Sequence, residues 1–261
     1  MSSNSDFILK KFDLMNKTVI VTGASRGLGR RFSYVLSCMG AKVVLAARNK
    51  IKLKETEDYI KKSGGECLSV NMDVNNEKSV IEAFKKVENI YGKISILINN
   101  AGIAISKSSL NTTMEDWDKV MNTNLRGVFM CSKFFAKYLV NKKSSGKIVN
   151  ISSIAAEKVL GNYLSSYSTS KAAVSNLTRT LANEYAKYNI QVNAIAPGYI
   201  LTDLNKKYFD TNEGKEMVKL IPQKRIGSAD ELDGALLLLC SDASSFMTGS
   251  IIRVDGGHVI S

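Results

Sequence analysis

Histidine and proline are nearly absent from this chain of 261 residues, which contains one histidine and two prolines. The histidine, His258, stands close to the last residue, so a Ser-His-Asp hydrolase or a histidine-rich metal centre would lack its essential side chain. We therefore expect no metal site. Two prolines leave few breaks in helices and strands, and no Pro- or Ser-rich linker or repeat divides the sequence. The length suits one large domain covering residues 1–261.

Cysteines and long apolar runs are also scarce. The four cysteines are widely separated and form no Cys-x-x-Cys pair: Cys38, Cys67, Cys131 and Cys240. Such spacing is typical of buried free thiols in a reducing compartment and indicates neither a zinc site nor a disulfide framework. No apolar run reaches the roughly 18 residues needed to span a bilayer, and residues 1–12 lack the apolar stretch of a signal peptide. We expect a cytoplasmic protein with no membrane partner.

Basic residues are in excess, because the net charge is +12 and 28 lysines stand beside 8 arginines. Residues 1–62 alone hold 13 basic and 5 acidic side chains. Nucleic-acid binding is one interpretation of this bias. However, the lysines of residues 50–54 and 61–62 have the spacing of helix faces, and no aromatic residues alternate with them. We expect a solvated basic surface and no nucleic-acid partner.

Short apolar runs alternate with longer segments of helical periodicity. The runs expected to form strands are residues 18–22, 42–46, 67–72, 94–99, 147–151, 191–196 and 250–254. The segments expected to form helices are residues 27–39, 50–63, 76–91, 114–141, 167–188 and 230–240. Continuous apolar or β-branched strands are typical of a parallel sheet covered on both faces. The pattern predicts an α/β fold, a doubly wound seven-stranded parallel sheet with helices on both faces.

Residues 199–226 show neither pattern and are too numerous for an ordinary connection. This stretch has an apolar, aromatic character, given by Tyr199, Ile200, Leu201, Leu204, Tyr208 and Phe209. We expect a mobile substrate lid here rather than a disordered linker.

A glycine-rich turn follows the first predicted strand directly and leads into the first helix. Gly23, Gly27 and Gly29 are spaced as Gly-x-x-x-Gly-x-Gly. Glycines permit a tight turn and close approach of the main chain to a ligand, and a helix N-terminus attracts phosphate. Between a strand and a helix of a βαβ unit, this spacing indicates a dinucleotide site.

The end of the second predicted strand distinguishes between the two nicotinamide cofactors. An NAD-binding domain usually has an acidic residue there, which accepts hydrogen bonds from the ribose hydroxyls. This chain has Arg48 instead, and Arg26 stands in the glycine turn. Arginine suits the geometry of a 2′-phosphate, although the alternative is that both side chains simply face solvent. The pattern favours NADP(H) over NAD(H).

Tyr167 and Lys171 are four residues apart in a segment of helical pattern, and Tyr167 follows Ser153 by fourteen residues. Positions i and i+4 share one helix face, and a cation beside a phenol lowers its pKa from the usual value of about 10. The pair would supply a proton donor and acceptor without histidine. By itself, the pattern is equally compatible with a solvated helix face.

Six short motifs together resemble the short-chain dehydrogenase/reductase family over nearly the whole chain. They are the glycine turn after Thr22, Asn99-Asn100-Ala101-Gly102, Asn122-Thr123-Asn124, Ile151-Ser152-Ser153, Tyr167-x-x-x-Lys171 and Pro197-Gly198. The resemblance implies a single-domain Rossmann fold. It also implies an NADP(H)-dependent oxidoreductase that interconverts a carbonyl and a secondary alcohol by hydride transfer.

The resemblance implies four catalytic residues. Tyr167 would protonate the carbonyl oxygen, or act as the base in the reverse direction, and Ser153 would orient and polarise that carbonyl. Lys171 would bind the nicotinamide ribose and shift the tyrosine pKa, and Asn124 would hold a water that links Lys171 to solvent. Ser152 is the alternative to Ser153, and Asn124 has the alternative role of bending or capping a helix.

The resemblance also implies a cofactor-binding set, with Asp73 and Val74 at the adenine and Ile200 and Thr202 beside the nicotinamide amide. The full set is Gly23, Ser25, Arg26, Gly27, Leu28, Gly29, Arg48, Asp73, Val74, Asn100, Ala101, Gly102, Tyr167, Lys171, Pro197, Gly198, Ile200 and Thr202.

The substrate is a small-molecule carbonyl or alcohol whose class stays open. The family more often has thirteen residues from serine to tyrosine, and the longer spacing here resembles sugar- and polyol-acting branches, as does Glu157. Its 3-oxoacyl reductases dock acyl carrier protein on basic residues, near whose places Lys142, Lys143 and Lys187 lie. Our leading expectation is a 3-oxoacyl thioester, and the alternative is a gluconate-type sugar or polyol.

The predicted helices over 114–141 and 167–188 carry more apolar residues than one core-facing stripe needs. Helices of this kind are buried on two sides, which predicts pairing with a second subunit. The resemblance implies a homotetramer. A cofactor-binding redox sensor without turnover is a further alternative, but the intact catalytic set argues against it.

Overall fold

The computed structural model describes residues 4–161, 163–202 and 206–261. Its centre is a sheet of seven strands in the order β3-β2-β1-β4-β5-β6-β7, with every neighbouring pair parallel. The strands are β1 (Thr18–Thr22), β2 (Lys42–Ala47), β3 (Cys67–Asn71), β4 (Ile96–Asn99), β5 (Gly146–Ile151), β6 (Ile190–Pro197) and β7 (Ile251–Val254). The predicted doubly wound seven-stranded parallel sheet is confirmed.

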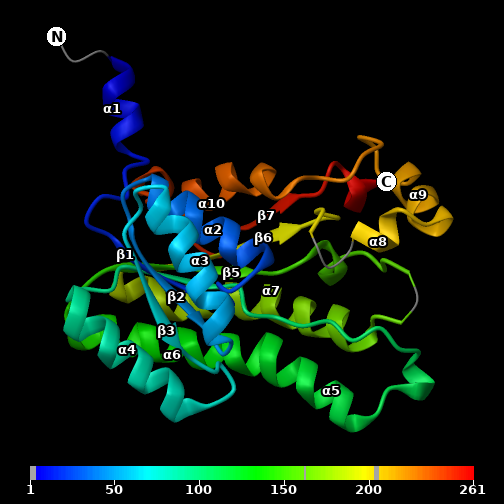
Figure 1. Cartoon of the computed structure of the whole chain (residues 1–261), viewed down its shortest axis with the longest axis horizontal. Coiled ribbons are helices and arrows are strands. Elements are labelled where there is room, and N and C mark those ends of the chain that lie inside the picture. Colours follow the sequence, from blue (N-terminus) through cyan, green and yellow to red (C-terminus); the bar gives the residue numbers. More distant parts are fainter. Residues whose placement is uncertain (1–3, 162, 203–205) are drawn as a thin grey trace.

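Helices cover both faces of this sheet (Figure 1). They are α1 (Asn4–Lys10), α2 (Gly27–Cys38), α3 (Lys50–Lys62), α4 (Glu77–Tyr91), α5 (Met114–Met121), α6 (Gly127–Asn141), α7 (Ser165–Tyr185), α8 (Lys206–Phe209), α9 (Asn212–Lys219) and α10 (Asp233–Cys240). Shorter helical turns are η1 (Ser109–Asn111), η2 (Asn122–Arg126), η3 (Ile154–Ala156), η4 (Ala186–Tyr188), η5 (Ala229–Leu232), η6 (Asp242–Ser244) and η7 (His258–Ile260).

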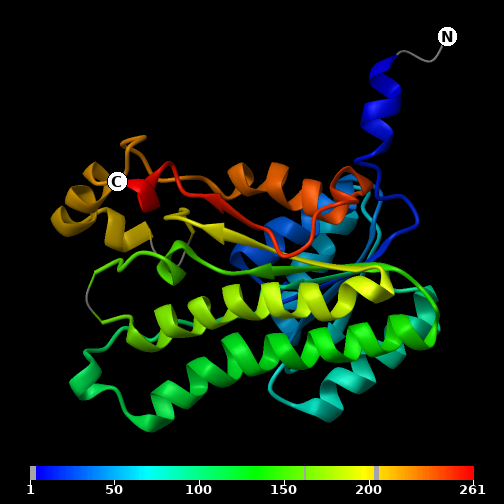
Figure 2. The same ribbon diagram turned by 180° about the vertical axis from the view of Figure 1, so that it is seen from behind.

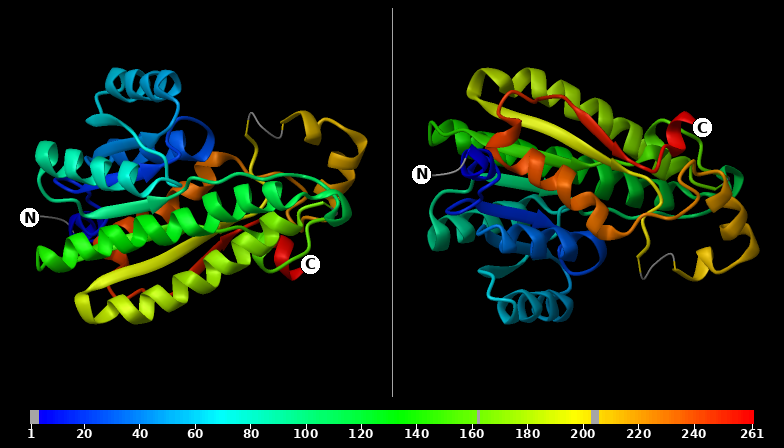
Figure 3. Two further views of the ribbon diagram at one scale, coloured as in Figure 1. Left: turned by 90° about the horizontal axis from the view of Figure 1, so that it is seen from below. Right: turned by 90° about the horizontal axis from the view of Figure 1, so that it is seen from above.

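Two apolar clusters, one on each face, hold the layers together. On one face α2, α3 and α10 pack through residues such as Phe32, Leu53 and Leu236. On the other face α4, α6 and α7 pack through residues such as Phe84 and Phe135. The views from below and above the sheet show these two helical layers in turn (Figure 3). Because the central strands are covered on both sides, β1, β2 and β4 are nearly continuous apolar runs rather than alternating ones.

The sheet has a switch point between β1 and β4. From β1 the chain winds outward through β2 to β3, and from β4 it winds the other way to β7. In open α/β sheets the crevice at the carboxyl ends of two such strands is where ligands bind. Val19, Ile20 and Val21 pair with Ile96, Leu97 and Ile98, so the ends of β1 and β4 lie together.

The structure differs from the predicted elements in three places. The helix expected over 114–141 is interrupted by the π-helical turn η2, in which the amide of Gly127 donates to the carbonyl of Asn122 five residues back. Residues 199–226 are not wholly irregular, since they contain α8 and α9, and positions 203–205 lie outside the described residues. Helix α1, which no sequence pattern predicted, projects from the body of the molecule (Figure 1).

Candidate active site

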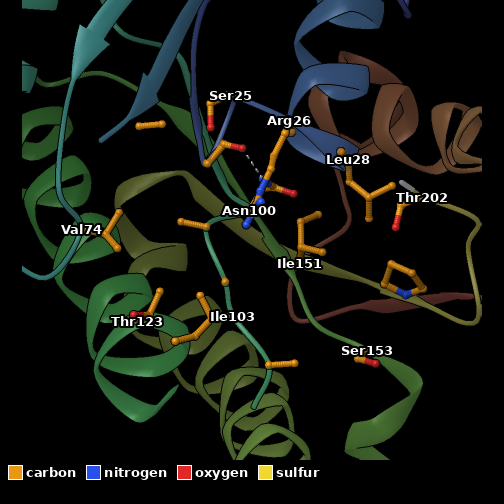
Figure 4. Close-up of a pocket in the computed structure, with 18 of the residues that line it drawn as sticks. Ser25, Arg26, Leu28, Val74, Asn100, Ile103, Thr123, Ile151, Ser153 and Thr202 are labelled. Atoms are coloured by element: carbon orange, nitrogen blue, oxygen red, sulfur yellow. Dashed lines mark hydrogen bonds between the residues drawn. The ribbon is translucent and has the colours of Figure 1, made fainter. Parts of the chain in front are cut away.

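A cleft of about 970 Å³ runs along the carboxyl ends of the strands. Nineteen of the twenty residues that the sequence assigned to catalysis or cofactor binding line it, from Gly23 in the first turn to Thr202 after β6. The remaining one, Asn124, lies behind its wall. In Figure 4, Val74 and Thr123 lie at one end of the cleft, and Ser153 and Thr202 lie toward the other.

The turn between β1 and α2 requires its glycines for two different reasons. Gly23 and Gly27 have φ values of 69° and 53°, which side chains disfavour. At Gly29 the reason is space, because a Cβ there would lie 2.2 Å from the carbonyl oxygen of Gly23. Arg26 precedes α2 without a side-chain cap, which leaves the first helical amides facing the cleft. Such amides and the helix dipole attract a phosphate anion.

Asn100 joins the end of β4 to this turn. Its Nδ2 donates to the carbonyl oxygens of Thr22 and Gly23, at 2.8 and 3.3 Å. In return the hydroxyl oxygen of Thr22 accepts from the amides of Asn100 and Ala101, both at 3.0 Å. Figure 4 shows Asn100 against the glycine turn. The switch point is therefore a hydrogen-bonded unit rather than two loops that merely meet.

Two arginines border the cleft at the end of β2. Arg26 and Arg48 are exposed, and neither forms an ion pair within the described parts of the chain. Lys52, on the first turn of α3, joins them in the lining. The only carboxylate among the described lining residues is Asp73, which is occupied by the amide of Asn75 at 3.0 Å. This end of the cleft is therefore electropositive.

The proton-transfer end is built on α7. Lys171 is buried, and its Nζ donates to the main-chain oxygen of Ile151 at 2.7 Å. Desolvation lowers the pKa of Lys171 to about 8. The ammonium nitrogen lies 5.7 Å from the centroid of the Tyr167 ring. The i, i+4 spacing therefore brings both side chains to one place.

The expected direction of the tyrosine shift is wrong. Burial raises the pKa of Tyr167 above its usual value, and a hydrogen bond with Ser153 offsets only part of that effect. The physical reason is that burial excludes water from the phenol, which disfavours the charged phenolate. The tyrosine is thus held as a protonated phenol at neutral pH.

The two neighbouring serines have different surroundings. The hydroxyl of Ser152 lies 3.1 Å from the Lys171 carbonyl and 2.7 Å from the Ser175 hydroxyl, which ties β5 to α7. Ser153 instead caps η3, accepting from the amide of Ala155 at 3.1 Å, and meets the Tyr167 phenol. The geometry therefore favours Ser153 over Ser152 as the hydroxyl beside the phenol.

Asn124 lies fully buried in the π-helical turn, where its side chain has no free hydrogen-bonding group. Its Oδ1 accepts from the amide of Ile103, and its Nδ2 donates to the Ile103 carbonyl, both at 2.8 Å. Nδ2 also reaches the hydroxyl of Ser170 at 3.0 Å. The side chain locks α5–α6 to α7 and to the loop after β4. The water that Asn124 was expected to hold would therefore have to bind the main chain of η2 and not the side chain. A π turn makes this feasible, because it disturbs the regular carbonyl pairing of a helix.

The wall beyond Ser153 and Tyr167 is apolar. Its lining residues are Ala104, Leu160, Leu164 and Tyr199. Of these only Tyr199 was expected from the sequence, because the other three belong to loops whose course depends on tertiary packing. The described cations of the cleft are Arg26, Arg48 and Lys52 at the β2 end, and Lys171, which is committed to Ile151.

The described part of the chain offers no cluster of three metal-ligating side chains, and no helix in it is long and apolar enough to cross a membrane. A glycine turn with free helix amides, an electropositive strand end and a Ser-Tyr-Lys group along one cleft define a dinucleotide-dependent oxidoreductase. A family model described as enoyl-(acyl carrier protein) reductase matches residues 23–258. The chain belongs to the short-chain dehydrogenase/reductase family.

Relatives in the family differ in substrate and cofactor. A glycerol dehydrogenase of Listeria innocua, described as NAD-dependent, is 37% identical over 96% of this chain and 97% of its own length. A 3-oxoacyl-[acyl-carrier-protein] reductase of Synechocystis is 36% identical over 95% of this chain and 98% of its own. The crystal structure of a gluconate 5-dehydrogenase from Burkholderia cenocepacia, in complex with NADP and tartrate, has 33% identity and a TM-score of 0.92, covering 97% and 99%.

Proposed function

We propose that this oxidoreductase uses NADPH to reduce a ketone carried on an apolar substrate, with a 3-oxoacyl thioester as the leading candidate. The observation that carries the proposal is the Ser153–Tyr167–Lys171 group, which faces an apolar wall in a cleft whose far end is electropositive.

The residues present fit a bound dinucleotide. The amides of the glycine turn and of α2 would hold the pyrophosphate, and Asp73 and Val74 would contact the adenine. Gly102 passes close to Lys171, since a Cβ there would lie 3.6 Å from its Nζ. Because Gly102 has no side chain, a ribose could lie against Lys171 at this point. Pro197, Gly198, Ile200 and Thr202 would surround the nicotinamide. When bound, the reduced cofactor supplies the hydride.

Proton transfer falls to this chain's own side chains. The phenol of Tyr167 donates its proton to the carbonyl oxygen as that oxygen becomes an alkoxide, and the Ser153 hydroxyl donates a hydrogen bond that orients the same oxygen. A pKa raised by burial keeps Tyr167 protonated, which suits reduction at neutral pH. The proton that Tyr167 loses in reduction is replaced from solvent, through a water at the Asn124 main chain and Lys171, whose pKa is about 8.

Preference for NADP(H) over NAD(H) rests on Arg26 and Arg48. Both guanidinium groups border the cleft without an ion pair to any described residue, and a 2′-phosphate between them would supply the missing anion. Lys52 adds a third charge. The NADP described in the Burkholderia structure supports this assignment, whereas the NAD dependence of the Listeria relative makes it a point to test.

An apolar substrate is supported by the cleft wall. A sugar acid would need a cation for its carboxylate, and the one described cation at this end, Lys171, is already bound to Ile151. Leu160, Leu164 and Tyr199 suit an acyl chain or a ring ketone.

A gluconate-type sugar or a polyol is the second candidate. It is favoured by the fourteen-residue separation of Ser153 from Tyr167 and by relatives described as acting on glycerol and gluconate. Glu157, which belongs to that separation, pairs with Arg253 at 3.5 Å and is therefore engaged with β7.

We further propose that residues 199–226 close over the substrate as a lid and that the enzyme is a cytoplasmic homotetramer. On α6 the side chain of Phe129 is 44% exposed, which leaves an apolar group for a second subunit to cover.

The test is nicotinamide absorbance with purified protein, NADPH or NADH, and matched panels of 3-oxoacyl thioesters, keto-sugars and polyols. We expect NADPH oxidation with the thioesters at a higher kcat/KM than with the keto-sugars. Turnover confined to sugars or polyols would replace the leading substrate by the second candidate. Absence of turnover with every pair, despite NADPH binding, would contradict the proposal.

A further inference from the structure

The wall loop, residues 154–161, 163 and 164, connects the two groups that would hold the substrate carbonyl. Ser153 precedes it and Tyr167 follows it by three residues. Leu160 and Leu164 of this loop line the cleft. The backbone of the loop includes left-handed residues, Gly161 at φ 102° and Tyr163 at φ 75°. Since non-glycine residues disfavour such values, contacts from outside the loop must hold this conformation.

Lys158 supplies the densest of those contacts. Its Nζ donates to the main-chain oxygen of His258 at 2.7 Å, to the main-chain oxygen of Ser261, and to the Ser261 hydroxyl at 3.2 Å. One ammonium group thus uses its three donors on a single segment about a hundred residues away. We call that segment the C-terminal turn (residues 258–261).

The C-terminal turn is also tied to residues 199–226. The hydroxyl of Ser261 lies 3.2 Å from the carbonyl oxygen of Leu220, which caps α9. Just before the turn, the carbonyl of Gly256 accepts from the amide of Gln223 at 3.2 Å. Figures 1 and 2 show the C-terminal end beside α9 from opposite sides. Lys158 and Leu220 therefore both form hydrogen bonds with Ser261.

A contact between two aromatic rings completes the connection. The ring of His258 is 3% exposed and lies 5.6 Å from the ring of Tyr199. The Tyr199 hydroxyl donates back to the Leu160 carbonyl of the wall loop at 3.3 Å. The loop is thus held at Lys158 and at Leu160 by a closed circuit of contacts that passes through the C-terminal turn and Tyr199.

We infer that Lys158 is a positioning residue for the substrate: by binding the C-terminal turn it fixes the wall loop, and with it Leu160 and Leu164, against the group that the ketone carries. The inference rests on the proposed function of the cleft. Lys158 does not touch the glycine turn or Arg48, so the cofactor end is independent of it. Its loss would loosen the substrate wall while leaving nucleotide binding in place.

The experiment compares Lys158→Met, Lys158→Arg and Lys61→Met. Lys61 serves as the matched control, because it gives up one contact with Glu57 at 2.5 Å at the far end of α3. For the best ketone of the panel, we expect Lys158→Met to raise the KM of the ketone about fivefold or more, with the KM of NADPH unchanged within about twofold. Arginine at this position should restore most of the difference, because it can donate to the same oxygens.

Amide hydrogen exchange gives a readout that does not depend on turnover. Lys158→Met should speed exchange in residues 154–164 and 256–261, with the central strands as slow as in the wild type. If the wild type reduces none of the ketones, the proposed function fails and exchange alone decides this inference. Unchanged exchange and unchanged KM in Lys158→Met would overturn it. A rise in the KM of both substrates, or faster exchange throughout the sheet, would overturn it as well, since either means general loosening.

Discussion

The Nζ of Lys171 donates to the main-chain oxygen of Ile151 at 2.7 Å, which joins the second turn of α7 to the last residue of β5. This bond fixes the ammonium beside Tyr167 at the carboxyl end of the sheet. It also explains why a fully desolvated lysine is tolerated there, since a buried charge needs a hydrogen-bonding partner. The same bond makes Lys171 a structural residue as well as a proposed catalytic one.

Replacing Tyr167 by phenylalanine removes the phenolic hydroxyl and keeps the ring. We expect kcat to fall by about 10²–10⁴, because the phenol hydrogen-bonded to Ser153 is the proposed proton donor. Binding of NADPH, followed by its fluorescence, should stay within about twofold. Tyr188→Phe is the control, since that residue is 44% exposed in η4 and outside the cleft. Full activity of Tyr167→Phe would disprove the proposed proton transfer.

Burial of Lys171 predicts a pH dependence of stability. Its pKa falls from 10.5 in the unfolded chain to about 8 in the fold, so between these values the unfolded state binds more protons. The Lys171 contribution to the free energy of unfolding therefore increases as pH rises from 8 toward 10.

The measurement is urea unfolding of the wild type and Lys171→Met at pH 7 and pH 9.5. Methionine cannot be charged, so any stability advantage of the variant at pH 7 should shrink by roughly 1–2 kcal/mol at pH 9.5. A constant difference between the two proteins across this range would mean that the lysine is not desolvated in solution.

Arg48 predicts cofactor selectivity. Arg48→Ala should raise the KM of NADPH by about tenfold or more and leave the KM of NADH nearly unchanged, because only NADPH carries the 2′-phosphate. Arg30→Ala is the matched control, since Arg30 lies 4.6 Å over the ring of Tyr59 and does not line the cleft. Equal effects of Arg48→Ala on both cofactors would remove the argument for NADP preference.

The close approach of the Gly23 main chain to Gly29 predicts that alanine substitution at Gly29 and at Gly234 has opposite effects on stability. Gly29→Ala places a Cβ 2.2 Å from the Gly23 carbonyl, so we expect loss of NADPH binding and a destabilisation of about 1–3 kcal/mol. Gly234→Ala meets nothing within 4 Å on α10 and should stabilise the protein by up to about 1 kcal/mol. Thermal unfolding and NADPH fluorescence measure both effects. A neutral Gly29→Ala would contradict the tight turn.

Local pattern was enough to predict much of the site. The glycine turn, Arg48 and the Tyr167–Lys171 pair were predicted correctly in position because each sits at a strand end or on one helix face, where spacing along the chain fixes direction. Leu160 and Leu164 were missed, since a loop's course depends on its distant contacts. The π turn at Asn124 was missed for a related reason, as the side chain that holds it bonds to Ile103 and Ser170 rather than to its own helix.

The sequence by itself determined the class of fold, the dinucleotide end and the pairing of Tyr167 with Lys171, because periodicity and glycine spacing act over a few residues. Only the tertiary structure decided how these groups are tuned. Burial raised the pKa of Tyr167 where proximity to a lysine predicted a decrease, and hydrogen bonding placed Ser153 rather than Ser152 beside the phenol. The grip of Lys158 on the C-terminal turn joins residues a hundred positions apart, a relationship that no local pattern specifies.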